Sequence, residues 1–191
     1  MTQRLLCLVL PLIAAACTTE RPATSQRPAR YALGHAPAAG VIAAADIDVN
    51  PTGAGLPAGQ GNATTGFTVY VAKCAMCHGP HGEGIDKYPK LIGREPPAGF
   101  NFGSDPKAAR TIGNYWPYAT TLYDYIHRTM PFNAPGSLTP DETYSVIAYL
   151  LTENGVIPAG PSVDAKSLPA IRMPNQPHFV KDNRTGGATF R

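Results

Sequence analysis

The sequence feature that most restricts the fold is the run Cys74-Ala75-Met76-Cys77-His78. Two thiols three positions apart, followed at once by an imidazole, match the pattern that attaches haem in c-type proteins. In this interpretation Cys74 and Cys77 bond to the two haem vinyl groups as thioethers, and His78 lies beneath the iron as an axial ligand. A thioredoxin-like redox pair needs a preceding strand, and a zinc site needs a second pair of ligands. The sequence offers neither, so the run predicts one covalent haem c.

The second axial ligand must come from elsewhere in the chain. Met130 follows a predicted helix and precedes Pro131, which limits the backbone of a loop able to cross the distal face of the haem. We therefore predict Met130 as the ligand, with Met173 in the tail and His127 on the helix as alternatives. A thioether opposite an imidazole raises the reduction potential of the iron. It also blocks the open position that oxygen or peroxide chemistry needs, so the pair predicts one-electron transfer and no catalysis by the chain alone.

Four further residues are candidates for supporting the haem. The carbonyl of Pro89 is placed to accept a hydrogen bond from the outer N–H of His78, which would fix the orientation of the imidazole. Arg94, Tyr115 and Trp116 carry donors suited to the haem propionates. For these three the alternative is an ordinary role, a surface charge for Arg94 and core aromatics for the other two.

The amino-terminal segment is typical of an export signal. Arg4 precedes an apolar run over 5–16, which is too short for a hydrocarbon layer that needs about 20 residues. The residues before Cys17 resemble the cleavage box of bacterial lipoproteins, in which the cysteine becomes the lipidated first residue. We predict a signal peptide of this type over 1–16 and a periplasmic protein tethered to the membrane through Cys17. The alternative is a plain signal peptide that leaves a free thiol.

Composition divides the remaining chain into three parts. Residues 17–62 are rich in small residues and proline without a sustained period, which predicts a flexible linker. Residues 63–157 form the predicted domain. Residues 158–191 contain five prolines and no clear period, which predicts an extended arm.

Three helices are expected in the domain. The first spans 66–77, with Phe67, Tyr70, Val71 and Cys74 on one face, and the second spans 120–129, with Leu122, Tyr125 and Ile126 aligned.

The third helix has the clearest start, because Thr139 can cap it, Pro140 suits its first position and Glu142 can close a capping box. Its apolar stripe consists of Tyr144, Ile147, Ala148 and Leu151, and Gly155 ends it. No stretch alternates, so the sequence predicts an all-α domain without a sheet.

Charge excludes one class of partner. Charged residues make up 15% of the chain and the net charge is +3, without a run of like charges. A nucleic-acid-binding protein needs a concentrated basic stripe, so we expect no nucleic-acid partner.

Over 63–157 the chain resembles a class I monohaem cytochrome c. The resemblance is based on the attachment motif, on Met130-Pro131 and on the capped final helix. It implies a small all-α fold around one covalent haem, in which the first and last helices cross, with Gly66 and Tyr70 meeting Ala148 and Tyr149.

A narrower resemblance covers most of residues 66–180. The segments Gly113–Ile126, Met130–Phe132, Pro135–Thr139 and Ile171–Asn175 are similar to cytochrome subunits of bacterial sulfite or sulfane dehydrogenases. That family implies a separate molybdopterin-containing partner that oxidises the sulfur compound, and a downstream cytochrome that receives the electrons. Two alternatives remain at this stage. One is a general electron shuttle or the haem subunit of another dehydrogenase, and the other is a haem enzyme or gas sensor with a displaceable ligand.

Overall fold

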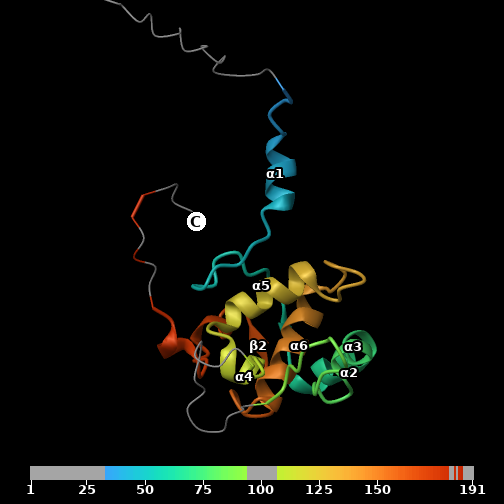
Figure 1. Ribbon diagram of the computed structural model, residues 1–191. Helices are drawn as coiled ribbons and strands as arrows, with labels where there is room; N and C mark the ends of the chain where they lie inside the picture. The colour runs from blue at the N-terminus through green and yellow to red at the C-terminus, as the bar shows by residue number, and fades with distance from the viewer. Residues whose placement is uncertain (1–32, 94–106, 181–182, 184, 187–191) are drawn as a thin grey trace, which may run out of the picture. The chain divides into compact units, whose positions relative to one another are not determined.

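The computed structural model describes residues 33–93, 107–180, 183 and 185–186. The chain divides into two units, Met1–Pro37 and Ala38–Arg191, and all the elements below belong to the second. The α-helices are α1 (Ala39–Ala45), α2 (Ala63–Lys73), α3 (Ala75–His78), α4 (Ile112–Tyr115), α5 (Ala119–Thr129) and α6 (Pro140–Glu153) (Figure 1). The other elements are the strands β1 (Gln60–Gly61) and β2 (Val163–Asp164) and the 3-10 helices η1 (Leu168–Ala170) and η2 (Gln176–His178). Within these described ranges, every helix is too short or too polar to cross a bilayer.

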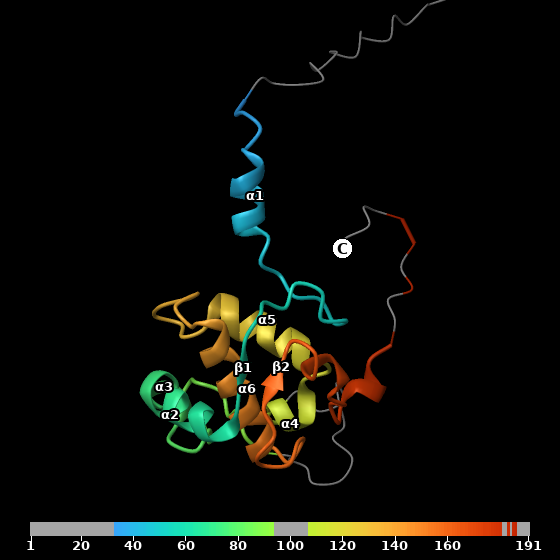
Figure 2. The ribbon, with the colours of Figure 1, turned by 180° about the vertical axis from the view of Figure 1, so that it is seen from behind.

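Helix α6 lies at the centre of the domain. Residues 143–151 are all buried, so the helix is enclosed on every side rather than along one stripe. Such all-round burial is the mark of a core helix. Helix α2 packs on one side of it and α5 on another, as the opposite views in Figures 1 and 2 show. The predicted stripe of Tyr144, Ile147, Ala148 and Leu151 is confirmed as buried.

The start of α6 is built as its sequence predicts. The Thr139 hydroxyl accepts a hydrogen bond from the Glu142 amide at 3.2 Å, and the Glu142 carboxylate accepts one from the Thr139 amide at 2.9 Å. This capping box satisfies two amide groups that the first turn leaves free, and a cap of this kind is worth about 1 kcal/mol. The same carboxylate lies 2.7 Å from the Lys73 ammonium and so joins the end of α2 to α6.

The crossing of α2 and α6 depends on Gly66. A Cβ atom at this position would lie 1.9 Å from the carbonyl oxygen of Ser145, so only glycine lets the two backbones approach this closely. Beside this contact, the ring of Tyr149 lies 5.1 Å from that of Tyr70 and 5.5 Å from that of Phe67. The expected crossing of the first and last domain helices is confirmed.

The first helix differs from its prediction in extent and in its buried face. It begins at Ala63, and Cys74, with φ −121° and ψ −37°, separates it from α3. Phe67 and Val71 are 45% and 51% exposed, while Gly66, Val69 and Tyr70 are buried. The buried face is centred on a glycine, which a count of apolar residues overlooks.

The second helix shows a similar shift. Leu122 and Ile126 are buried as expected, but Tyr125 is exposed and Tyr123 is fully buried. The Tyr123 ring lies 4.7 Å from that of Tyr144 on α6, an inclined aromatic contact that fixes how α5 sits on the central helix.

The expectation of no sheet is wrong in one detail. Strands β1 and β2 pair antiparallel, with Gln60 opposite Asp164 and Gly61 opposite Val163. Strands of two residues are too short to show alternation, and their partners lie about a hundred residues apart in sequence. The domain nevertheless remains mainly helical, as predicted.

Both flanking segments take part in the core, contrary to their description as a linker and an extended arm. On the amino-terminal side Val49 is buried, and its amide donates to Asp124 of α5 at 2.8 Å. On the carboxyl-terminal side Val163, Leu168 and Met173 are buried. Prolines and turns separate these apolar residues, so no helical or strand periodicity in the sequence predicts their burial.

Gly66→Ala tests the crossing of α2 and α6. The added methyl group would overlap the Ser145 carbonyl, and we expect the free energy of unfolding of the haem-loaded protein to fall by about 2–3 kcal/mol. Denaturant titration measures this loss. Thr68→Ala, an exposed change on the same helix, is the control and should stay within about 0.5 kcal/mol of the wild type. Equal stability of Gly66→Ala and the wild type would contradict the close approach.

Candidate haem site

The two motif cysteines lie on a tight turn at the end of α2. The amide of Cys74 donates to the carbonyl of Tyr70 at 2.8 Å, which ends α2, and the carbonyl of Cys74 accepts from the His78 amide at 3.0 Å, which begins α3. Cys77 lies within the same turn, and both thiols are free and half-buried. Two thiols and an imidazole are therefore presented together by five consecutive residues, which is the donor set that a covalent haem requires.

The surroundings of Cys74 keep its thiol protonated near neutral pH. Burial raises the pKa of this thiol to about 11, and the neighbouring Cys77 acts in the same direction while the Lys73 ammonium opposes it. As a free thiol, Cys74 therefore lacks the lowered pKa that is typical of redox-active cysteines.

The orientation of His78 is set by a backbone carbonyl. Its Nδ1 atom lies 2.9 Å from the carbonyl oxygen of Pro89, as the sequence predicts. A carbonyl can only accept, so Nδ1 carries the proton and Nε2 keeps its lone pair. The imidazole is thereby held in the tautomer that a metal ligand needs, with Nε2 as the coordinating atom.

The loop that carries Pro89 folds back onto the motif. The Tyr70 hydroxyl donates to the carbonyl of Gly79 at 2.7 Å, and the amide of Gly84 donates to the carbonyl of His78 at 2.8 Å. Burial raises the pKa of Tyr70, so its hydroxyl remains a donor at physiological pH. Sequence analysis missed this role of Tyr70. The available signal was that a tyrosine on the predicted buried face needs a hydrogen-bond partner for its hydroxyl.

Met130 lies at the end of α5, where its amide donates to the carbonyl of Ile126 at 3.0 Å. It is half-buried and packs against the same hydrophobic core as Cys74, Leu91 and Trp116. The structure therefore brings the predicted methionine to the core that also supports the cysteine motif.

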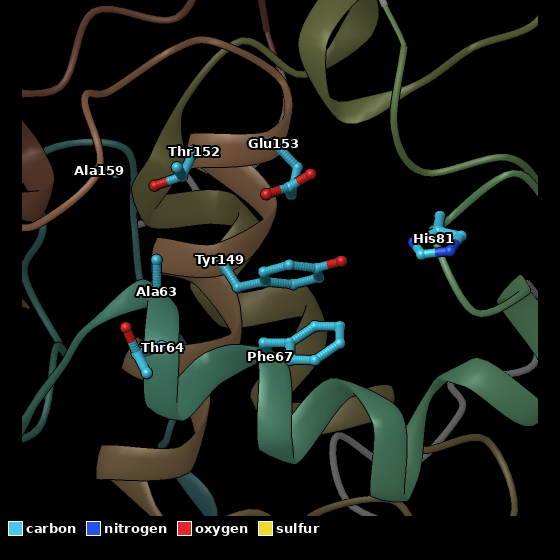
Figure 3. A pocket seen from close by; sticks show the side chains of 8 residues that line it. All are labelled: Ala63, Thr64, Phe67, His81, Tyr149, Thr152, Glu153 and Ala159. Atoms are coloured by element: carbon cyan, nitrogen blue, oxygen red, sulfur yellow. The ribbon is translucent and has the colours of Figure 1, made fainter.

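The alternative ligands are in less suitable places. Met173 is 2% exposed and forms part of the core. The His127 ring lies 5.5 Å from the Tyr123 ring, with its Nδ1 atom buried. His81, which the sequence does not favour as a ligand, faces Phe67 and Tyr149 across a hollow of about 360 Å³ (Figure 3), at the crossing of α2 and α6.

The residues predicted to contact propionates have other partners in the structure. The Trp116 indole N–H donates to the Thr121 hydroxyl at 3.0 Å. The guanidinium of Arg110 lies 5.1 Å from the centre of the Tyr115 ring, and the Tyr115 carbonyl accepts from the Asn175 amide at 2.7 Å. Arg94 and Cys17 lie outside the described residues.

Comparison with known proteins agrees with this geometry. The cytochrome c family matches residues 63–154. The chain is similar to the crystal structure of the sulfane dehydrogenase SoxCD from Paracoccus pantotrophus, with 37% sequence identity, a TM-score of 0.70 and coverage of 81% of this chain and 74% of that chain. It also matches thiosulfate dehydrogenase TsdBA from Marichromatium purpuratum, with 27% identity, a TM-score of 0.34 and coverage of 47% of this chain and 17% of that chain.

A mainly helical domain that presents two thiols and a histidine in this way defines a haem-binding electron-transfer protein. The chain belongs to the cytochrome c family. Its fold is the class I cytochrome c fold, and its cofactor is covalently bound haem c, with Cys74 and Cys77 in the positions of the attachment motif.

Replacement of the motif cysteines tests the attachment. Cys74→Ser and Cys77→Ser should each retain haem through one thioether, and the double variant should lose all haem to acid–acetone extraction. The pyridine haemochrome spectrum of the washed protein measures this, and its band should move to longer wavelength in each single variant because one vinyl group stays conjugated. Met76→Ser changes the exposed residue between the two cysteines and should leave the spectrum unchanged. Haem retained by the double variant would contradict the assignment.

Proposed function

We propose that this cytochrome is the haem subunit of an exported sulfite or sulfane dehydrogenase. A separate molybdopterin-containing subunit oxidises the sulfur compound, and the present chain accepts the electrons singly and passes them to a downstream cytochrome. The chain is then a non-catalytic subunit of an oxidoreductase. The observation that carries this proposal is the 37% identity to a chain of the SoxCD structure over 81% of this chain.

The part of the chain covered by the likeness to SoxCD supports the proposal. The cytochrome c family match stops at residue 154, whereas the likeness to SoxCD reaches into the flanking segments. Those segments contribute Val49 and Met173 to the core here, so they are part of the folded unit. A likeness that includes them favours a role shared with sulfur dehydrogenases over a role shared with cytochromes in general.

The proposed iron ligands are His78 and Met130. Bound haem supplies an iron that alternates between the ferric and ferrous states by one electron. The Pro89 carbonyl holds the proton of His78 on Nδ1 and so directs Nε2 to the metal. The thioether of Met130 would serve as the second ligand, would favour the ferrous state and would leave no coordination position for a substrate. The burial of Met173 supports this choice of methionine.

Location is the third part of the proposal. The signal-like segment before Cys17 supports export to the periplasm, where a lipid on Cys17 would tether the chain to a membrane.

Met130→Ala tests the axial ligand. Loss of the thioether should lower the reduction potential and let the ferrous protein bind carbon monoxide at neutral pH, because a coordination position opens. Redox titration and the visible spectrum measure both effects. Met173→Leu is the matched control, since it replaces a buried methionine of the core and should leave ligation intact. A wild type that already binds carbon monoxide readily would instead support a sensor or a haem enzyme.

Purification from native membranes tests the partner. A tagged wild-type chain should bring down a molybdopterin protein, and sulfite or a sulfane-sulfur substrate should reduce its haem in that complex but not in the isolated chain. Cys17→Ser should move the complex from the membrane to the soluble fraction while preserving its composition.

Three results would overturn parts of the proposal. Haem that no sulfur compound reduces in the presence of its co-purifying proteins would remove the sulfur assignment and favour a general shuttle. Reduction by a different substrate would point to another dehydrogenase. Unchanged fractionation of Cys17→Ser would remove the lipid tether.

A further inference from the structure

Asn154 makes a set of contacts at the end of α6 that neither the motif nor the proposed function uses. Its side chain is 2% exposed. The Oδ1 atom accepts hydrogen bonds from the Gly93 amide at 3.0 Å and the Gly113 amide at 3.1 Å. The Nδ2 group donates to the carbonyl of Leu91 at 3.2 Å and to that of Leu150 at 2.7 Å.

These four bonds use the full capacity of the side chain. A carboxamide has one oxygen with two lone pairs and one nitrogen with two hydrogens. The two backbone amides donate to the side-chain oxygen of Asn154, and the two backbone carbonyls accept from its side-chain nitrogen. These partners determine which way round the carboxamide is oriented. A buried carboxamide satisfied in this way is rigid, and losing one side of it leaves backbone groups unpaired in the core.

Asn154 joins three segments that are separate in sequence. Leu150 belongs to α6, Gly113 belongs to α4, and Leu91 and Gly93 belong to the loop that follows the haem motif. The contacts on that loop bracket Ile92, so the side chain holds the loop on both sides of one residue. A second tie strengthens the junction, because the Ile112 amide of α4 donates to the Leu91 carbonyl at 3.1 Å.

The part of the loop that Asn154 holds is close in sequence to Pro89, the partner of His78. The amides of Leu91 and Ile92 donate to the carbonyl of Gly82 at 2.8 Å and 3.1 Å, which closes the loop between them. Pro89 lies inside this closed loop, two residues before Leu91, and its carbonyl holds the Nδ1 proton of His78. Asn154 is therefore linked to the proposed haem ligand by its hydrogen bond to Leu91, by the two residues of chain back to Pro89, and by the hydrogen bond from Pro89 to His78.

We propose that Asn154 is a positioning residue for the haem: through Leu91 and Gly93 it holds the Pro89 carbonyl against His78. This inference rests on the proposed role of His78 as an iron ligand. The Asn154 side chain forms its hydrogen bonds with Gly93, Gly113, Leu91 and Leu150 and not with His78, so it acts through the loop. Its effect is to keep the imidazole in one tautomer and one orientation while the iron changes charge, which limits reorganisation at the ligand.

Asn154→Asp is the primary test, because the carboxylate has nearly the same shape. It can still accept from Gly93 and Gly113, but it can donate neither to Leu91 nor to Leu150. The measurement is the rate at which the Nδ1 proton of His78 exchanges with solvent in the reduced, haem-loaded protein, observed by NMR with ¹⁵N-labelled histidine. We expect this rate to rise by about tenfold, as the loss of one or two neutral hydrogen bonds predicts.

Thr143→Val is the matched control. Thr143 is fully buried on the same helix, and its hydroxyl donates to the Thr139 carbonyl at 2.9 Å, away from the loop. This variant should lower global stability without changing exchange at His78. A purely structural role for Asn154 would make both variants act alike, and that result, or an unchanged rate in Asn154→Asp, would overturn the proposal.

The wild type supplies a second measurement that does not depend on a variant folding. If Asn154 couples the loop to α4 and α6, the amide protons of Gly93 and Gly113 and the Nδ1 proton of His78 should share one dependence on low denaturant concentration. Exchange of the His78 proton that is independent of the two glycines would refute the coupling. The visible spectrum of His78→Ala identifies a failure of the ligand assignment, because its bands change if His78 binds the iron and stay as in the wild type if it does not.

Discussion

The close approach of α2 to α6 at Gly66 is the contact on which the rest of the structure depends. It lets two backbones meet where any side chain would overlap the Ser145 carbonyl. Because α2 ends at Cys74, this contact also determines where the two thiols and His78 lie relative to the central helix. A glycine in the middle of a helix costs about 1 kcal/mol in propensity, and here that cost is offset by the burial of Val69 and Tyr70 against α6.

Backbone carbonyls, rather than charged side chains, organise the site around the motif. The Pro89 carbonyl orients His78, the Gly79 carbonyl receives the Tyr70 hydroxyl, and the Leu91 carbonyl receives the amide of Asn154. Each is a contact between neutral groups. Charged side chains lie beside them, since the Lys73 ammonium acts on the Cys74 thiol and the Glu83 carboxylate accepts from the His81 amide at 2.8 Å. The loop that carries Pro89 therefore determines the orientation of His78.

Local chemistry made several parts of this structure predictable. The capping box at Thr139, the tie between His78 and Pro89 and the buried stripe of α6 each involve residues close together in sequence or a motif with a known requirement. The errors have a different origin. The buried face of α2 is centred on Gly66, which no scale of apolarity marks. The pairing of β1 with β2 and the burial of Met173 depend on partners far away along the chain.

Asn154 shows where the two kinds of information divide. The sequence predicts that Gly155 ends the last helix, and Gly155 does adopt a φ of +63° there. That the same asparagine joins α4 and the loop of Pro89 follows only from how α6 is enclosed. The sequence by itself determined the haem attachment, the helical class and both ends of the last helix, because these depend on spacing and on local hydrogen bonding. The tertiary structure alone decided which faces of α2 and α5 are buried, how the flanking segments join the core and what holds the loop of Pro89, because those contacts form between residues that only packing brings together.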